Sequence, residues 1–213
     1  MKIDFISDIA CPWCAVGLNS LEQALASLPA DMPVELHFQP FELNPAMAAG
    51  GEDSSEHLMA KYGMSAEQLE QNRQGLRARG EEVGFHFGAM KHIWNTFAAH
   101  RLLYWAGLQS AEAQRKLKHG LLTAYHGEGS NPGDAAVLLA LAEAAGLERA
   151  AALGVINSER YADEVRAAEQ YWQQAGIRSV PSMVINDRHL ITGGQPPDVF
   201  ERALREIAAG TVG

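Results

Sequence analysis

The stretch IACPWCAVG, residues 9 to 17, holds both of the cysteines in this chain of 213 residues. Cys11 and Cys14 are separated by Pro12 and Trp13, which is the spacing known as C-x-x-C. Two cysteines placed at random in a chain of this length would fall at this spacing only about 1% of the time. The motif therefore needs a physical reason, and the interpretation of the fold begins from it.

Three explanations of the pair compete. Unoxidised cysteines often serve as small buried apolar residues. The pair can also be half of a zinc site, or a redox dithiol in which one thiolate attacks a disulfide and the other resolves the mixed disulfide. Two cysteines cannot form a four-sulfur zinc site, and the two histidines closest in sequence, His86 and His92, lie inside a helical stretch. We therefore expect no metal at this site.

The sequence around the pair predicts that it begins a helix. KIDFIS, residues 2 to 7, alternates like a short strand, and the leucines after the cysteines recur at helical spacing up to Pro29. A cysteine at a helix N-terminus faces the positive end of the macrodipole and unpaired backbone N–H groups, which both favour the thiolate. We therefore expect Cys11 to be the nucleophile and Cys14, one turn inside the helix, to be the more buried, resolving thiol.

The two residues of the spacer are candidate substrate-binding residues. Pro12 has no N–H and a fixed φ, which suits the first helical turn and stiffens the spacer. Trp13 is uncharged and bulky, so it offers an apolar rim to a partner peptide or a thiol ligand. Asp8, just before the motif, is expected to shape the turn that leads into the helix; the alternative is that it accepts the proton of Cys14.

The remaining chain has three parts. PVELHFQPFEL, residues 33 to 43, alternates like a second strand that ends near Pro40. From residue 45 to 155 the spacing is helical with no convincing strand, and in NPGDAAVLLALAEAAG we expect Asn131 to cap a helix. After one more helix, two apolar runs on either side of residues 186 to 188 predict a hairpin, and PPDVFERALREIA predicts the last helix.

This order of elements resembles the thioredoxin fold with a helical insertion after the second strand, as in the DsbA family. Within that family the chain is most similar to the FrnE-like and 2-hydroxychromene-2-carboxylate isomerase-like branch, which includes the kappa-class glutathione transferases. The stretches that carry the resemblance are SDIACPWCAVG, NTFAAHRLLYWAG, NPGDAAVLLALAEAAGL and SVPSMVINDRHLITGGQPPDVF. It implies an α/β fold, with a thioredoxin-like domain of residues 1–44 and 156–213 and an all-helical inserted domain of residues 45–155.

The resemblance also implies a second part of the site. The proline that opens the third strand of this fold, here Pro181, is cis and faces the cysteine pair. The backbone of the preceding residue, here Val180, pairs with the extended chain of a substrate. Asn95, His100 and Arg101 match the family's N-T-F-x-A-H-R-L run, and they either line the groove above the cysteines or make buried hydrogen bonds.

Three functional hypotheses follow. The leading one is a cytosolic thiol–disulfide oxidoreductase, a DsbA-like dithiol–disulfide oxidoreductase or isomerase, with Cys11 as the nucleophile and Cys14 as the resolving thiol. The alternative is a glutathione-dependent isomerase or transferase of the 2-hydroxychromene-2-carboxylate isomerase or kappa-class type, a branch that typically has Ser at the position of Cys11. A non-catalytic chaperone or scaffold is the third, and it leaves the C-P-W-C motif unexplained.

Composition and charge narrow the range of partners. The net charge of −9 and the lack of a basic run argue against nucleic acid and anionic membranes, and no apolar stretch reaches the ~18 residues of a transmembrane helix. Asp4 and Asp8 interrupt the apolar segment that a signal peptide needs, so we expect a cytoplasmic protein whose disulfide is transient. We expect its partners to be thiols and disulfides of proteins or small molecules, with glutathione as a candidate co-substrate and no permanently bound cofactor; a homodimer stays open.

Overall fold

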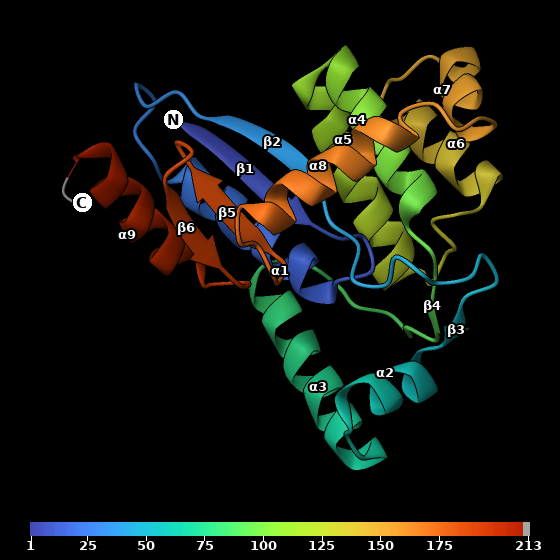
Figure 1. Cartoon of the computed structure of the whole chain (residues 1–213). Coiled ribbons are helices and arrows are strands. Elements are labelled where there is room, and N and C mark those ends of the chain that lie inside the picture. Colours follow the sequence, from blue (N-terminus) through green and yellow to red (C-terminus); the bar gives the residue numbers. More distant parts are fainter. Residues whose placement is uncertain (211–213) are drawn as a thin grey trace.

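A four-stranded sheet forms the centre of the computed structural model, which describes residues 1–210. Its strands are β1 (Lys2–Ser7), β2 (Glu35–Pro40), β5 (Ser182–Ile185) and β6 (His189–Thr192). The order across the sheet is β2-β1-β5-β6, with β1 parallel to β2 and antiparallel to β5, and β5 antiparallel to β6 (Figure 1). The predicted strands and the predicted hairpin are therefore all confirmed, and β2 is an edge strand that ends at Pro40, where a missing N–H costs no ladder hydrogen bond.

Helices cover both faces of this sheet. α1 (Pro12–Ala26) and α9 (Pro197–Ala208) pack on one face, and α8 (Ala162–Gln174) crosses the other (Figure 1). Alternate side chains of β1 serve the two faces, because Phe5 packs with α1 and α9 while Ile6 packs with Trp172 of α8. Both residues are fully buried, so the first strand of the chain lies in the middle of the core.

The segment between β2 and α8 is a helical insertion. Its helices are α2 (Ser54–Tyr62), α3 (Ala66–Glu82), α4 (Phe97–Gln109), α5 (Ala111–Leu122), α6 (Ala135–Ala144) and α7 (Arg149–Ile156). The last four of these helices pack around a second hydrophobic core that includes Leu102, Leu117 and Leu138. Ile9 and Ala10, from the loop before the cysteines, belong to this second core, so the insertion holds the cysteine loop directly.

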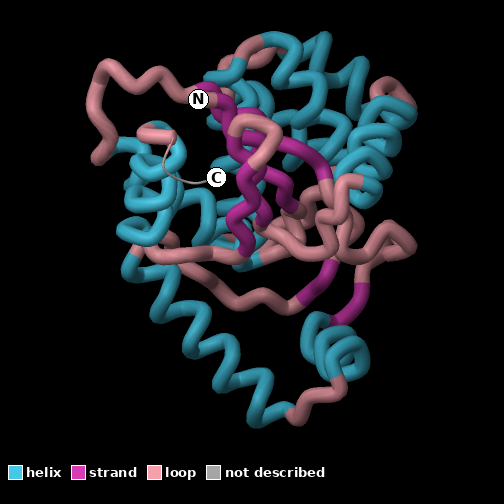
Figure 2. Tube along the Cα trace, turned by 60° about the vertical axis from the view of Figure 1, so that its left-hand side comes forward, coloured by secondary structure: helices cyan, strands magenta, loops and turns pink. Residues whose placement is uncertain are grey.

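The helices α2 and α3 form an arm that extends away from the sheet in both views (Figures 1 and 2). Ser65 and Gln68 make a reciprocal capping box that starts α3, and Gly63, at a φ of 65°, ends α2 in the left-handed region. Most of α3 is exposed, as its polar sequence predicts, but Leu69 and Leu76 are buried. Within residues 1–210, no helix is both long and apolar enough to cross a bilayer.

The insertion departs from the prediction of an all-helical segment. β3 (Glu52–Asp53) and β4 (His92–Ile93) form a small antiparallel pair that joins the two ends of the arm and does not pair with the central sheet. A π-helical turn, η1 (Thr123–Gly127), follows α5. Two-residue strands are too short to show an alternating pattern, and for that reason sequence patterning does not predict them.

The predicted cap at Asn131 is wrong. α6 begins at Ala135, and the side chain of Asp134 accepts hydrogen bonds from the N–H groups of Ala136 and Val137. The Asn131 side chain instead accepts from the N–H of Gly133 in the turn before the helix. Both residues are favoured caps, and the carboxylate also interacts well with the positive end of the helix dipole.

We expect Gly17→Ala to destabilise the protein, although alanine favours helix by about 1 kcal/mol over glycine. A Cβ at Gly17 in α1 would lie 2.8 Å from Cγ of Pro181 and 3.4 Å from Cα of Gly194. Relieving that overlap costs about 1–3 kcal/mol, so urea unfolding should give a net loss. Gly75→Ala in α3 is the matched control, since its Cβ would meet nothing within 4 Å; equal stability of the two variants would contradict the close packing of α1 on Pro181.

Candidate active site

The cysteine pair begins α1 as the sequence predicts. Cys11 is the N-cap residue and Pro12 occupies the first helical turn. Both cysteines are free thiols. Cys11 is 4% exposed and Cys14 is 0% exposed, so the predicted order holds, although even Cys11 is largely covered. Trp13 is 42% exposed and stands at the rim.

The strand opposite the pair brings the second predicted element to it. The Val180–Pro181 peptide bond is cis, which confirms the expectation from the resemblance. The Cys11 thiol donates to the carbonyl oxygen of Val180 at 3.5 Å. Pro181 lies against Gly17 of α1. The start of α1 and the segment before β5, which are distant in sequence, therefore meet at the cysteine pair.

Asp8 has a larger role than the turn that the sequence predicts. Its Oδ1 accepts from the N–H of Ala10 at 3.1 Å, which is the expected turn. The same carboxylate also accepts from the hydroxyl of Thr96 at 2.9 Å and from the N–H of Leu43 at 2.7 Å, and His100 lies 3.3 Å away. Asp8 is 1% exposed. Through these hydrogen bonds its buried carboxylate connects the cysteine loop to the start of α4 and to the segment after β2.

The charge state of Asp8 follows from these contacts. Burial alone would raise the pKa of the Asp8 carboxyl, but the hydrogen bond and charge of His100, with the N–H groups of Leu43 and Ala10, outweigh it and hold that pKa below its usual range. Asp8 is therefore a carboxylate at neutral pH. Its fixed negative charge acts on the buried side chains of Lys118 and His126.

Lys118 of α5 is the functional candidate that the sequence analysis missed. Its side chain is 1% exposed, and its ammonium lies within electrostatic range of Cys14, Asp8 and Cys11. Burial lowers the pKa of Lys118 to about 8, against the opposing effect of those negative charges. The sequence alone does not mark it, because its place on the inner face of α5, between the buried Gln114 and Leu122, is seen only in the structure.

Cys14 is the thiol most affected by this environment. Burial raises the pKa of Cys14 well above its ordinary value, and the adjacent Cys11 side chain raises it further. The positive charge of Lys118 and a hydrogen bond from the Asp8 backbone act in the opposite direction. The ionisation of Cys14 therefore depends on a residue of the insertion.

His126 completes the wall behind the cysteines. It belongs to the π-helical turn η1, and its Nε2 donates to the carbonyl of Ile9 at 2.8 Å. Burial lowers the pKa of His126 to about 3, so its ring is neutral and donates a hydrogen bond without adding charge. π-helical turns occur often at functional sites, and here the turn places His126 under the cysteine loop.

The three candidates from the N-T-F-x-A-H-R-L run have structural contacts. Asn95 binds the carbonyl of Met47, and His100 faces Asp8. Arg101 is buried, and its guanidinium donates to backbone carbonyls of the α7 end, including that of Val155 at 3.0 Å. Of the two expectations for these residues, hydrogen bonding within the protein describes what the structure has, with His100 and Arg101 buried and Asn95 half-buried.

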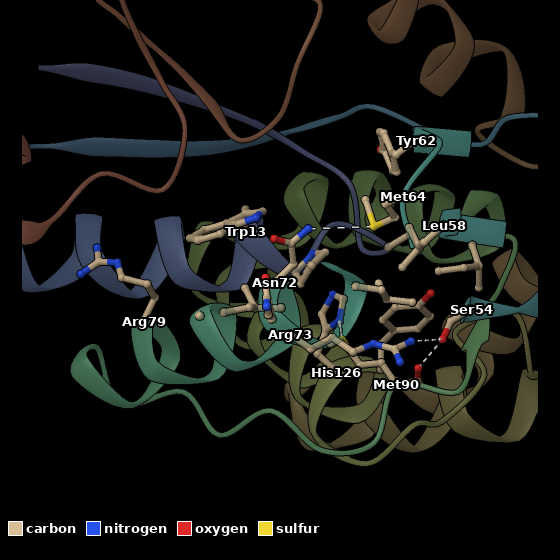
Figure 3. Close-up of a pocket in the computed structure, with 18 of the residues that line it drawn as sticks. Trp13, Ser54, Leu58, Tyr62, Met64, Asn72, Arg73, Arg79, Met90 and His126 are labelled. Atoms are coloured by element: carbon tan, nitrogen blue, oxygen red, sulfur yellow. Dashed lines mark hydrogen bonds between the residues drawn. The ribbon is translucent and has the colours of Figure 1, made fainter. Parts of the chain in front are cut away.

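A cavity of about 570 Å³ opens beside the cysteine loop (Figure 3). Ala10, Pro12 and Trp13 form one side of it, so the predicted substrate-binding residues of the spacer both line it. The arm of α2 and α3 forms the opposite side, and His126 lies at its base. Cys11 and Val180 are not lining residues, so the cavity adjoins the thiol without enclosing it.

Comparison with known proteins agrees with this geometry. A family model described as a DSBA-like thioredoxin domain matches residues 2–205. The uncharacterised protein YwbO of Bacillus subtilis (strain 168) is 28% identical over 215 residues, which cover 97% of this chain and 96% of that protein. A crystal structure of a probable DsbA oxidoreductase from Streptomyces coelicolor is similar with a TM-score of 0.89 and 34% identity, over 99% of this chain and 90% of that one.

A second solved structure is similar in fold. The 2-hydroxychromene-2-carboxylate isomerase has a TM-score of 0.73 at 17% identity, over 99% of this chain and 98% of that one. Identity this low supports a common fold and says nothing of a common activity.

We expect Lys118→Met to reverse a pH-dependent loss of stability. The folded-state pKa of Lys118 is about 8 and its ordinary value is 10.5. Below pH 8 the buried ammonium therefore lowers the free energy of unfolding by the full equivalent of this pKa difference, about 3 kcal/mol. Between these pH values the unfolded chain binds more protons, and the stability of the wild type rises with pH. Urea unfolding should therefore show Lys118→Met to be the more stable protein at neutral pH, with the difference shrinking toward pH 10.5.

Lys116→Met is the matched control. Lys116 lies on the same helix, exposed, and pairs with Glu112, so its substitution should give a small difference in unfolding free energy that does not vary over this pH range. A pH-independent difference for Lys118→Met as well would contradict the buried, destabilised ammonium.

Proposed function

The chain belongs to the DSBA-like thioredoxin domain family, and on that premise we propose that it is a thiol–disulfide oxidoreductase whose dithiol is Cys11 and Cys14. The observation that carries the proposal is the position of Cys11, at the N-cap of α1 with its sulfur 3.5 Å from the carbonyl of Val180. A thiol there faces both the helix dipole and the segment beside which an incoming chain would lie.

The reaction begins with the thiolate of Cys11. It attacks one sulfur of a disulfide, forms a mixed disulfide, and releases the other sulfur as a thiolate. The unpaired N–H groups in the first turn of α1 and the helix dipole stabilise the negative charge on Cys11 before the attack. In the reverse direction, when the second thiol of a dithiol partner attacks the mixed disulfide, the same groups stabilise Cys11 as the leaving thiolate.

Cys14 resolves the mixed disulfide. It must lose its proton before it attacks the sulfur of Cys11, and burial opposes that loss by raising the pKa of Cys14. Lys118 lowers the barrier to ionisation because its positive charge acts on the Cys14 thiolate. The products are a Cys11–Cys14 disulfide and a reduced partner; the reverse sequence of steps oxidises a dithiol partner instead.

On the side of β5, Val180 and Pro181 are the residues that would contact the substrate. The backbone of Val180 is the group that would pair with an extended segment of a protein partner, a form of strand addition. Pro12 and Trp13 would contact the same partner from the helix side, where Trp13 has an exposed apolar face. Protein or small-molecule thiols and disulfides are therefore the proposed partners.

A glutathione-dependent isomerase or transferase is the second candidate. The observation that favours it is the cavity of about 570 Å³ at the spacer residues, which has the size of a small-molecule site. The cysteine at position 11 argues against an isomerase or transferase, because the isomerase and kappa-class branch typically has Ser at that position. In the oxidoreductase proposal glutathione acts as a thiol co-substrate in the cytosol, where it would reduce the protein after each turnover.

The oxidoreductase proposal predicts an asymmetry between the two cysteines. In Cys14→Ala the mixed disulfide on Cys11 has no internal thiol to release it. Release to millimolar external thiols should be slower by orders of magnitude, because a positioned intramolecular group acts at a far higher effective concentration. Cys14→Ala expressed in the cytosol should accumulate reducible adducts, which non-reducing electrophoresis and intact mass after acid quenching will detect.

Cys11→Ser is the control and should accumulate no adduct. Two structural cysteines would trap nothing in either variant, and a glutathione transferase would keep its turnover without Cys14. Empty lanes from both variants, together with unchanged activity toward a disulfide substrate, would defeat the oxidoreductase proposal.

A further inference from the structure

The cavity beside the cysteine loop is a half-open hollow between that loop and the arm. Its lining comes from both helices of the arm, from β4 and from η1 (Figure 3). Its volume of about 570 Å³ lies within the ~300–1,000 Å³ that is typical of small-molecule sites. Ala10 and Pro12 are both lining residues, so the wall of the cavity runs directly past Cys11.

The inside of the cavity is mainly apolar. Its apolar lining residues include Leu58, Met64, Leu69, Leu76, Met90 and Ile93. Trp13 forms the rim, and Figure 3 shows it on the helix side, opposite Leu58 and Tyr62 of α2. A flat apolar body such as an aromatic ring fits this lining, because sulfur-bearing and aromatic side chains pack well against such rings.

The charged groups of the cavity all have one sign. Arg73 and Arg79 line it, and none of its lining residues within the described chain is Asp or Glu, although the whole chain has a net charge of −9. Arg79 pairs with Glu82. Within residues 1–210, Arg73 is hydrogen-bonded only to neutral groups, the hydroxyls of Ser54 at 2.8 Å and Ser55 at 3.2 Å, and Figure 3 shows its guanidinium beside Ser54.

One carboxylate lies near Arg73 outside the cavity. Asp53 is within electrostatic range of it, but Asp53 caps α2 by accepting from the N–H groups of Ser55 and Glu56 and is not a lining residue. The guanidinium of Arg73 therefore keeps its positive charge available to the cavity. A carboxylate is the group that complements it, through the Nη1 and Nε hydrogens that the two serine hydroxyls leave free.

From this combination we infer that the cavity binds the non-reacting part of an aromatic, anionic small-molecule disulfide, with its carboxylate on Arg73 and its disulfide over Pro12 at Cys11. The inference rests on the proposed function. The thiolate of Cys11 attacks one sulfur of the ligand, which forms a Cys11 mixed disulfide and releases one aryl thiolate. Cys14 then gives up its proton to solvent, attacks the Cys11 sulfur and releases the second aryl thiolate, so two electrons pass from the protein dithiol to the ligand.

The test compares three disulfides that differ in one property at a time. Dithiobis(nitrobenzoate) is aromatic and anionic, dithiodipyridine is aromatic and uncharged at neutral pH, and hydroxyethyl disulfide is aliphatic and uncharged. The second-order rate constant of the reduced protein with each is measured by stopped-flow absorbance, or by coupled thiol release for the aliphatic compound. The result is expressed relative to the rate of each disulfide with free glutathione, which removes differences in intrinsic reactivity.

Arg73→Met should lower the normalised rate for dithiobis(nitrobenzoate) by about tenfold, since it removes the charged hydrogen-bond donor to the carboxylate. It should leave the two uncharged disulfides unchanged. Arg77→Met is the matched control: Arg77 lies on the same helix, pairs with Glu70 and does not line the cavity. Arg77→Met should change none of the three rates.

Gly75→Met tests whether the aromatic part of the ligand occupies the cavity, because it fills cavity space without removing any protein contact. Gly75 lines the cavity, and a Cβ on it would meet nothing within 4 Å, so a methionine side chain can occupy the space while favouring the helix. Both aromatic disulfides should lose about tenfold in rate while hydroxyethyl disulfide keeps its rate. This variant keeps the inference falsifiable if Arg73→Met disturbs the contact between α3 and α2.

Nitrobenzoate, which has no sulfur, gives a readout that is independent of redox chemistry. It should bind Cys11→Ser in a calorimetric titration, and this binding should be lost in Cys11→Ser with Gly75→Met. Equal effects of the cavity variants on all three disulfides, or no binding of nitrobenzoate, would overturn the inference and leave the oxidoreductase proposal intact. A reduced wild type that reacts with none of the three disulfides would instead contradict the proposed function.

Discussion

The buried carboxylate of Asp8 is the contact on which the rest of the site depends. It accepts hydrogen bonds from the backbone of Ala10 and Leu43 and from the side chain of Thr96, and it faces His100. A buried charge without such partners costs several kcal/mol, so these groups are held to it. The loop before the cysteines, the segment after β2 and the start of α4 consequently share one fixed point, and the thiols inherit their position from it.

The helical insertion supplies the buried Lys118 and His126 beside the thiols as well as one side of the cavity. The thioredoxin-like part of the chain supplies both thiols and Val180, while Lys118 and His126 come from α5 and η1 of the insertion. The positive charge of Lys118 offsets the negative charge of Asp8 and favours the thiolate of Cys14. A substitution in the insertion can therefore alter the ionisation of Cys14 while the thioredoxin-like sheet stays as it is.

The fold and the role of the cysteines could be predicted because they depend on local sequence patterns. The role of Lys118 and the cavity could not, because they depend on contacts between residues distant in sequence. The C-x-x-C spacing, the strand alternation and the turn at Asn186 and Asp187 are contained in a few adjacent residues; both turn residues have positive φ, as the sequence pair predicts. The role of Lys118 and the cavity depend on how α3 and α5 are packed on α1. A lysine in a polar stretch reads as solvated until the neighbouring helix is known to cover it, and a polar helix such as α3 shows no sign that it forms one side of a cavity.

In the proposed function, Cys11 lies between two surfaces that recognise different parts of a partner. On the strand side, the carbonyl of Val180 offers a backbone group, which any extended chain can pair with regardless of its sequence. On the arm side, Arg73 and the apolar lining select for size, shape and charge. Only the arm-side surface can discriminate strongly among ligands, because an unmatched charge or an overfilled cavity costs free energy whereas a backbone pair does not. The two-helix arm, whose Leu76 also joins the core of the thioredoxin-like sheet, is therefore in our proposal the element that sets which disulfides reach the thiol.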